Sequence, residues 1–381
     1  MSSASHFQRY WLPGLLFQSV IIGGGYATGR ELVEFFLIAG PRGGLLGMLV
    51  ATLAFSLIAA LFFEFARLSQ SNNYRHFFQQ LLGRYWFLFE WAYCCLGLLV
   101  LSVIGAAAGD MAATHLGIQS SLGTFTLMAL VGLLVFWGTA LIEKVLAAWS
   151  LLLYLTYAVF VCFYLWQHGA ALTDNFSPAA APAADRHWLM GSIQYVGYSI
   201  AVLPVILFCV KHMQCRRDAI TAGLLAGPIA MLPAVLFFLA MAASFPEVLE
   251  ASVPADFMMQ RLDLPWLKIV FYLVVFGTFV ETGTAFIHAV NERINEVYCE
   301  RQASMPRWLR PLVAITALVL ALVLANQVGL IDLIAQGYGT LTWVFVLVFV
   351  LPLFTRGLWV IVRSPGVVQR QAAADNQPPK P

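Results

Sequence analysis

An acidic side chain lies inside one of the most apolar stretches of this sequence. Glu281 falls within KIVFYLVVFGTFVETGTAFIHAV, where Thr278 shares its helix face and Thr282 follows it directly. An ionised, unpaired carboxyl would be costly there, so Glu281 should be protonated, paired, or beside a bound cation or water. Two interpretations stay open. Glu281, Thr278 and Thr282 handle a coupling proton or sodium ion, or Glu281 is a static partner of an arginine or a backbone amide.

A second unusual stretch is Gly23–Glu31, GGGYATGRE, inside the first hydrophobic segment. Three consecutive glycines and Gly29 favour local unwinding of a helix. Unwound backbone survives in a membrane only where it is buried in protein or lines a wet cavity. The polar residues that follow are too costly to face lipid. The stretch therefore predicts a bend around a bound molecule; close helix packing through Gly25 and Gly29 is the alternative.

Two opposite charges are expected toward the outer side of the membrane, on different helices. Arg30 follows the glycines, and Asp332 begins the polar face of the last segment. If those helices meet, Arg30 and Asp332 would pair as an outer gate. The alternative is that water solvates each charge separately, which is common for such groups.

The composition places the chain among membrane proteins. Of its 381 residues, 61% are hydrophobic and 10% are charged, and the mean hydropathy is +0.81. The net charge of +2 and the absence of a basic cluster argue against nucleic-acid binding. The six cysteines show no CxxC or His/Cys spacing, so no disulfide, metal site or cofactor is expected.

The elements that must position these residues are membrane-spanning helices, each of roughly 20 apolar residues. Ten segments are long enough, so the prediction is an all-α polytopic membrane protein. Its five-plus-five arrangement is an inverted repeat, because an odd number of spans per half reverses the orientation of the second half. The segments lie near 10–38, 43–67, 85–111, 121–141, 144–167, 187–211, 217–243, 264–290, 308–326 and 328–354.

This arrangement divides the chain into five parts. Residues 1–9 are expected to form a cytoplasmic N-terminus, and 10–168 the first five-helix repeat. An extracellular or periplasmic linker is expected at 169–186. The second five-helix repeat is expected at 187–363, followed by a disordered polar tail at 364–381. A further outer connection, 244–263, is expected to hold short helices that cap an outer vestibule.

The distribution of basic residues predicts the orientation. With the N-terminus inside, 16 Lys and Arg residues are cytoplasmic and only five are outside, as the positive-inside rule requires. Both termini are therefore expected in the cytoplasm, with the chain in the inner or plasma membrane. The lipid bilayer and a small-molecule substrate are the expected partners.

A second interruption is expected in segment six, GSIQYVGYSIAVLPVILF. Gly197 and Ser199 break the apolar run, and Pro204 removes one helix hydrogen bond and frees carbonyls near Ile200. An ordinary proline kink is the alternative. Each interruption lies in the first helix of its half, and the two are expected to lie at the same depth in the membrane. Helices one and six are therefore predicted to be broken.

The stretch FQSVIIGGGYATGRELVEFF resembles the first segment of the YkvI-type amino-acid permeases. The usual family pattern is close to GAGFASGQE; this chain has Gly24 for the Ala, Tyr26 for the Phe, Thr28 for the Ser and Arg30 for the Gln. The family is placed in the amino acid–polyamine–organocation superfamily, which has the leucine-transporter type of five-plus-five fold. The motif covers about the first 30 residues, and the likeness in layout covers all ten segments.

The resemblance implies where a substrate would bind. Amides of the broken first helix would hold a substrate carboxylate, helped by the partial positive charge of roughly +0.5 at a helix N-terminus. Carbonyls of helices one and six would hold the ammonium. The implied substrate-binding residues are Gly23, Gly24, Gly25, Tyr26, Thr28, Gly197, Tyr198 and Ser199.

Two departures concern the coupling ion. Sodium-coupled relatives have an adjacent hydroxyl pair on segment eight, whereas Thr282 and Thr284 are separated by Gly283. Some proton-coupled relatives have a lysine inside segment five, whereas Lys144 lies at the cytoplasmic end. A proton at Glu281 is therefore the hypothesis carried forward.

The expected function is secondary transport of a small zwitterion, an amino acid by resemblance, through alternating access. Two other classes stay open. A membrane-embedded enzyme would need a paired-acid or metal constellation, which is not visible, and a ligand sensor would need an output domain. A divalent-metal carrier would be expected to show Asp or Asn on helix one and Met or His on helix six, and GGGYATG and YSIAVLP lack them.

Overall fold

The computed structural model describes residues 5–363, except 72, 138, 178–187, 263 and 301. Within these residues every regular element is a helix. The predicted tail and the second half of the predicted linker therefore lie outside the described residues. The described beginning of that linker contains the short helix α9 (Ala171–Asn175).

The long elements follow the predicted segments. They are α4 (Gly40–Leu68), α6 (Phe87–Leu116), α7 (Ser120–Trp137), α8 (Thr139–His168), α10 (Trp188–Ser199) with the 3-10 helix η4 (Ile200–His212), α11 (Arg216–Ala242), α13 (Pro265–Glu300), α14 (Leu309–Val328), and the run α15 (Leu330–Asp332), η6 (Leu333–Tyr338), α16 (Gly339–Phe345), η7 (Val346–Val350), η8 (Leu353–Gly357) and α17 (Leu358–Arg363).

The remaining elements are short. They are η1 (Phe7–Trp11), α1 (Leu12–Ile21), α2 (Gly24–Ala27), α3 (Arg30–Phe35), η2 (Leu37–Ala39), α5 (Tyr74–Leu82), η3 (Gly83–Tyr85), η5 (Glu247–Glu250) and α12 (Pro254–Arg261). The first predicted segment is thus three short helices rather than one long helix.

Length and composition support a multi-pass membrane protein. In the described chain, eight helices or helix runs are long and apolar enough to cross a bilayer, and Ser120–Phe136 is apolar but shorter. Many large apolar side chains on these helices are exposed, as expected for surfaces that face lipid. The ten-helix inverted repeat stays a prediction, because these helices do not by themselves establish the symmetry of the two halves.

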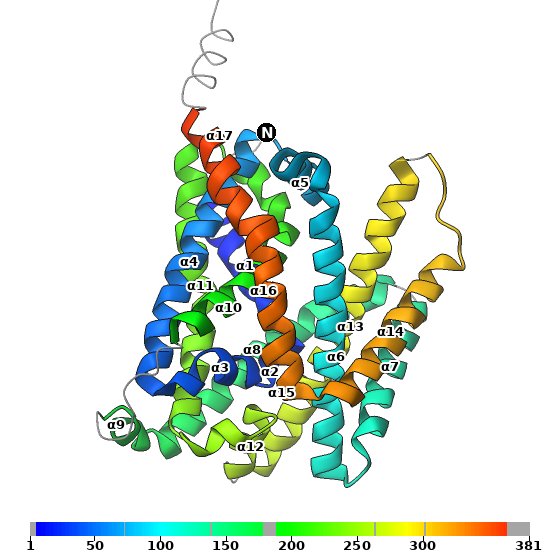
Figure 1. The fold of residues 1–381 in the computed structure, drawn as a ribbon. Helices are drawn as coiled ribbons and strands as arrows, with labels where there is room; N and C mark the ends of the chain where they lie inside the picture. The colour runs from blue at the N-terminus through cyan, green and yellow to red at the C-terminus, as the bar shows by residue number, and fades with distance from the viewer. Residues whose placement is uncertain are drawn as a thin grey trace, which may run out of the picture.

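The helices form two groups (Figure 1). α1, α4, α10 and α11 make one group, and α6, α7, α8, α13 and α14 make the other. Helices α4 and α11 approach closely because small residues face each other: a Cβ on Gly223 would collide with the backbone of Ala60. The single turn α2 contacts α6 and α13 of the second group, and its Tyr26 ring lies 6.2 Å from the ring of Phe237 on α11, so α2 lies where the two groups meet.

The outer connection and the ends of the chain lie at opposite ends of the molecule. Figure 1 shows the N-terminal end and α17 together at one end, and α3, α9 and α12 at the other. The connection 244–263 contains two short helices, η5 and α12, as the sequence predicts. Which end faces the cytoplasm remains a prediction.

Candidate functional site

The first membrane segment is interrupted twice. Helix α1 ends at Ile21, and Gly23 has an extended backbone (φ −106°, ψ −166°) before the turn α2 begins. Gly29 then adopts a left-handed conformation (φ 77°), which favours glycine, and α3 begins at Arg30. The glycine-rich stretch therefore forms two bends that enclose one helical turn.

Neighbouring elements satisfy the backbone groups that these bends release, as membrane burial demands. The Gly24 N–H donates to Thr282 Oγ1 on α13 at 2.9 Å. The Tyr157 hydroxyl on α8 donates to the Ala27 carbonyl. The Ala255 N–H on α12 donates to the Thr28 carbonyl at 2.9 Å. Hydrogen bonds from three other segments therefore stabilise the interruption.

Because some of the amides of the first segment already have partners, fewer of them are available to a substrate. The Gly23 N–H donates to the Ile21 carbonyl at 2.9 Å, and the Gly24 N–H is bound by Thr282. The N–H groups of Gly25 and Tyr26 belong to the first turn of α2, where a helix offers no internal acceptor. The resemblance implied four amides for a carboxylate; the geometry leaves two.

The sixth segment changes its winding without a gap. The α-helix α10 ends at Ser199 and continues directly as the 3-10 helix η4, which contains Pro204. Long 3-10 runs inside a helix are unusual and often mark a hinge. The expectation of a broken sixth helix is thus corrected to a change of helix type, at the position where Pro204 withdraws a hydrogen bond.

A small cavity lies beside both irregular segments. Its volume is about 70 Å³, which is enough for several water molecules or a small solute, since a single water needs roughly 10–15 Å³ by the same measure. It lies among the membrane-spanning helices and opens between them. Its lining consists of Val20, Ile21, Gly23, Gly24, Gly25, Tyr26, Glu31, Leu96, Val100, Tyr198, Ser199, Val202, Thr282, Phe286 and Tyr338.

The chemistry of this cavity centres on Glu31. Of the described residues that line it, Glu31 has the only carboxyl group, and its side chain is buried with 5% exposure. The Tyr198 hydroxyl donates to Glu31 Oε2 at 2.6 Å. Glu31 Oε1 lies so close to the backbone of Gly25 that a Cβ at Gly25 would collide with it. The glycine therefore makes room for the carboxyl group.

Two aromatic rings form one wall of the same cavity. Tyr198 and Tyr338 stack with ring centroids 4.4 Å apart and planes 10° from parallel. A Cβ at Gly25 would lie 3.5 Å from the Tyr338 hydroxyl, so this hydroxyl also approaches the interrupted backbone. A carboxylate next to aromatic rings is suited to an ammonium group, because both attract positive charge.

Six of the eight residues implied for substrate binding line the cavity: Gly23, Gly24, Gly25, Tyr26, Tyr198 and Ser199. The other two are placed elsewhere. The Thr28 hydroxyl donates to the Gly25 carbonyl at 2.7 Å and accepts from the Arg30 N–H at 3.1 Å, so Thr28 holds the second bend. Gly197 packs against Thr342, where a Cβ would collide with the threonine side chain.

The three predicted coupling residues point in different directions from α13, because they occupy different positions around the helix. Thr282 lines the cavity and accepts the hydrogen bond of Gly24. Glu281, one position earlier on α13, is half-buried and does not belong to the lining. Thr278 is buried and donates to the Val274 carbonyl of its own helix at 2.8 Å. Only Thr282 among them therefore reaches the interrupted backbone.

The structure does not bring Arg30 and Asp332 together as a gate. Arg30 forms an ion pair with Glu34, one turn along its own helix, at 2.8 Å. Asp332 is exposed and accepts a hydrogen bond from Gln336 at 3.2 Å. Residues four apart on a helix face each other, so Glu34 is within reach of the Arg30 guanidinium.

Arg30 instead fastens the outer connection over the interrupted segment. Its guanidinium donates to the Leu249 and Ala251 carbonyls at 2.8 and 3.2 Å. Farther along the same connection, Asp256 accepts from His115 of α6 at 2.8 Å and from the Tyr272 hydroxyl of α13. This connection therefore ties α3 to α6 and α13.

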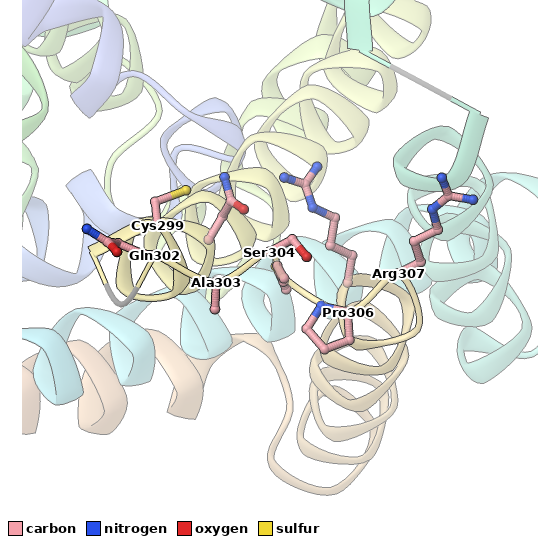
Figure 2. Close-up of a pocket in the computed structure, with 9 residues that line it drawn as sticks. Cys299, Gln302, Ala303, Ser304, Pro306 and Arg307 are labelled. Carbon is pink, nitrogen blue, oxygen red and sulfur yellow. The ribbon is translucent and has the colours of Figure 1, made fainter.

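Three larger hollows in the described part of the chain do not include Glu31. One, of about 360 Å³, lies on the α8 and α11 side of Tyr26 and has an almost wholly apolar lining. A second, of about 370 Å³, lies at the outer connection, where the carboxylate of Asp256 is already bound by His115 and Tyr272. The third, of about 590 Å³, follows the loop between α13 and α14, away from the interrupted segment. Figure 2 shows the side chains of this loop, among which Gln302, Ser304 and Arg307 are exposed. The small cavity at Glu31 therefore remains the candidate site.

The residues that the sequence analysis did not assign to the site include Glu31, Phe286 and Tyr338. Glu31 ends the GGGYATGRE stretch, so its nearness to the glycines was a signal that could have identified it. Tyr338 lies between Gly337 and Gly339 in a segment predicted only to carry a polar face. Phe286 gives no sequence signal that separates it from an ordinary lipid-facing aromatic.

Comparison with known proteins identifies the fold. No protein family and no curated protein gives a significant sequence match. Among solved structures, MhsT in complex with L-phenylalanine is 16% identical, with a TM-score of 0.51 over 94% of this chain and 97% of that chain. A mutant of the Eremococcus coleocola manganese transporter is 12% identical, with a TM-score of 0.53 over 91% and 78%. The chain therefore has the leucine-transporter type of fold.

Proposed function

We propose that this chain is a secondary transporter of a small zwitterionic solute, an amino acid, which it carries by alternating access. The observation that carries the proposal is the buried Glu31 carboxyl group in a small cavity beside the twice-interrupted first segment. Of the solved structures of similar fold named above, one is of a manganese transporter and the other is of MhsT in complex with L-phenylalanine. Fold alone does not define a substrate, so the argument rests on the site.

The site offers separate positions for the two charges of an amino acid. Glu31 and the stacked rings of Tyr198 and Tyr338 would hold the ammonium group. The N–H groups of Gly25 and Tyr26 would hold the carboxylate, since the amides of Gly23 and Gly24 have partners. This assignment differs from the one implied by family resemblance, in which backbone carbonyls alone hold the ammonium.

A divalent metal ion fits this lining less well. Hard cations such as Mn²⁺ take several oxygen ligands, and carboxylates usually supply more than one. Glu31 is the single carboxylate among the described lining residues, and the other oxygen donors are hydroxyls and backbone groups. An ammonium group needs one carboxylate and a few acceptors, which this cavity supplies.

The test is uptake by the purified chain in liposomes. A panel of amino acids is offered, with sodium and proton gradients imposed separately, and counterflow is measured without any gradient. Saturable uptake and counterflow of at least one amino acid are expected. Wild-type liposomes that show neither, under all gradients, would contradict transport of this class. We also propose the inner or plasma membrane as the location, with both termini in the cytoplasm.

A further inference from the structure

Glu31 requires a positive charge beside it whether or not a substrate is bound. We propose that Glu31 carries a proton while the cavity is empty and releases it when the ammonium group of the substrate binds, so that the protein exchanges one proton for one substrate molecule. This inference rests on the proposed function. It also moves the coupling role from Glu281, the residue that the sequence favours, to a residue of the cavity itself.

The first step is the burial of the carboxyl group. Glu31 is 5% exposed, and it lies at the start of Arg30–Leu68, a helix run long and apolar enough to cross a membrane. An ionised carboxylate buried in this way is costly unless a cation accompanies it, and the usual response is to bind a proton. The empty cavity therefore favours the neutral acid.

The second step is the absence of a protein cation to take the place of the proton. In the described part of the chain, Glu31 forms no ion pair with arginine, lysine or histidine. The neighbouring Arg30 is bound to Glu34 and to two loop carbonyls. Its guanidinium is thus directed toward the outer connection rather than toward the cavity.

The remaining titratable groups around Glu31 are mostly phenols. The phenols are Tyr26 of α2, Tyr195 and Tyr198 of α10, and Tyr338 of η6. Helix α11 contributes the apolar residues Phe237 and Met241, which lie beside Gly29. Helix α12 contributes Asp256, which is bound to His115. Phenols are neutral at physiological pH and offer no compensating charge. Only a proton or a bound cation can neutralise Glu31.

The third step is that both cations use the same oxygen atoms. Glu31 Oε2 accepts from Tyr198, Oε1 lies against the backbone of Gly25, and both residues line the cavity. The cavity of about 70 Å³ can hold an ammonium group against Glu31, but a proton on the same carboxyl group removes the negative charge that the ammonium group needs. Binding of the ammonium group therefore releases the proton to water. The resulting carboxylate–ammonium pair is neutral, as the protonated carboxyl group was, while the substrate carboxylate is held by the backbone amides.

The experiment measures proton release on binding of L-alanine to the full-length protein in lipid nanodiscs. Calorimetric titrations are run in two buffers of different ionisation enthalpy, over a series of pH values. Linkage predicts release of about one proton per bound L-alanine where Glu31 starts protonated, and weaker binding as the pH falls. In infrared difference spectra, the band of a protonated carboxyl group should disappear as L-alanine binds.

Three variants make the assignment specific. Glu31→Gln keeps an oxygen that can accept from Tyr198, and it should bind L-alanine weakly, with no proton release and no carboxyl band. Tyr198→Phe removes the hydroxyl that donates to the ionised carboxylate of Glu31. The pH at which half a proton is released per bound L-alanine should therefore be higher than in the wild type. Asp174→Asn, at an exposed carboxyl group in α9, should behave like the wild type.

The outcomes separate the two proposals. Binding and counterflow of L-alanine without proton release at any pH, or release that persists in Glu31→Gln, would overturn the exchange at Glu31 and leave transport standing. Release that is lost in Glu281→Gln but retained in Glu31→Gln would return the coupling role to Glu281. If the wild type neither binds nor transports any member of the amino-acid panel, the proposed function fails, and the exchange fails with it.

Discussion

The hydroxyl of Tyr198 donates a hydrogen bond of 2.6 Å to Glu31, and this contact joins the two irregular membrane segments. Glu31 lies at the second position of α3, after the second bend of the first segment. Tyr198 lies one residue before the end of α10, where the sixth segment changes to a 3-10 helix. Any movement of one segment against the other must lengthen or break this hydrogen bond.

Removing this hydrogen bond should weaken transport. A hydrogen bond to a charged group contributes roughly 1.5–3 kcal/mol, so Tyr198→Phe should raise the KM for amino-acid uptake by about tenfold or more. Tyr195→Phe is a matched control on the same helix, because the Tyr195 hydroxyl is buried without a hydrogen-bond partner in the described structure. Uptake kinetics in liposomes measure both; equal KM values for the two variants would contradict the role of Tyr198.

A methyl group at Gly25 should displace the carboxyl group of Glu31. The Cβ of Gly25→Ala would collide with Glu31 Oε1, and the cavity would lose both volume and its acid. Counterflow should fall to background while the protein remains folded, as judged by gel filtration and helical circular dichroism. The comparison is Gly132→Ala on α7, whose Cβ would meet only a terminal methyl of Leu318 at 3.3 Å. Counterflow by Gly25→Ala at the rate of Gly132→Ala would count against this placement of Glu31.

The hydroxyl of Thr282 should matter through the backbone that it binds. Thr282→Val leaves the Gly24 N–H without its acceptor, and a buried unsatisfied donor costs roughly 1–3 kcal/mol. The melting temperature in detergent should fall, together with uptake. Thr278→Val serves as the control, since that hydroxyl bonds only to its own helix at Val274. Melting temperatures that change alike would show that Thr282 has no special part in holding the interruption.

The outer connection should loosen when Asp256 is removed. Asp256→Ala deletes the acceptor for His115 and Tyr272, which hold α12 against α6 and α13. Since each such bond to a charged group contributes roughly 1.5–3 kcal/mol, amide hydrogen exchange in the peptide around Ala255 should become about tenfold faster or more.

A surface ion pair in the same connection provides the comparison for Asp256. Glu247 pairs with Arg261, but both side chains are substantially exposed, and such pairs contribute roughly 0–1 kcal/mol. Glu247→Ala should therefore leave the exchange rate near Ala255 almost unchanged. If Asp256→Ala exchanges no faster than Glu247→Ala, the connection is held by apolar packing, and its polar contacts are incidental.

The local character of the first segment could be predicted from residue types. Consecutive glycines weaken a helix wherever they occur, and the backbone they release must be buried. The sequence therefore indicated an interruption at Gly23–Gly29, and the structure has bends at both positions. The short helices of the outer connection are likewise local features, which its amphipathic pattern indicated.

The partners of the charged residues depended on how the chain turns. The two bends rotate α3 by an amount that no helical periodicity describes, and they carry Glu31 back over Gly25. The same rotation directs Arg30 toward Glu34 and the outer connection, so the gate with Asp332 does not form. On α13, a difference of one residue decides that Thr282 and not Glu281 lines the cavity.

By itself, the sequence determined that this is a membrane protein of many helices and that its first membrane segment is interrupted. Hydropathy and glycine content act locally, so both features could be inferred without the tertiary structure. The tertiary structure decided which carboxyl group shares a cavity with that interruption. The physical reason is that burial, pairing and access depend on the phase and packing of helices far apart in the chain, and Glu31, Tyr198 and Tyr338 meet only after those helices have packed.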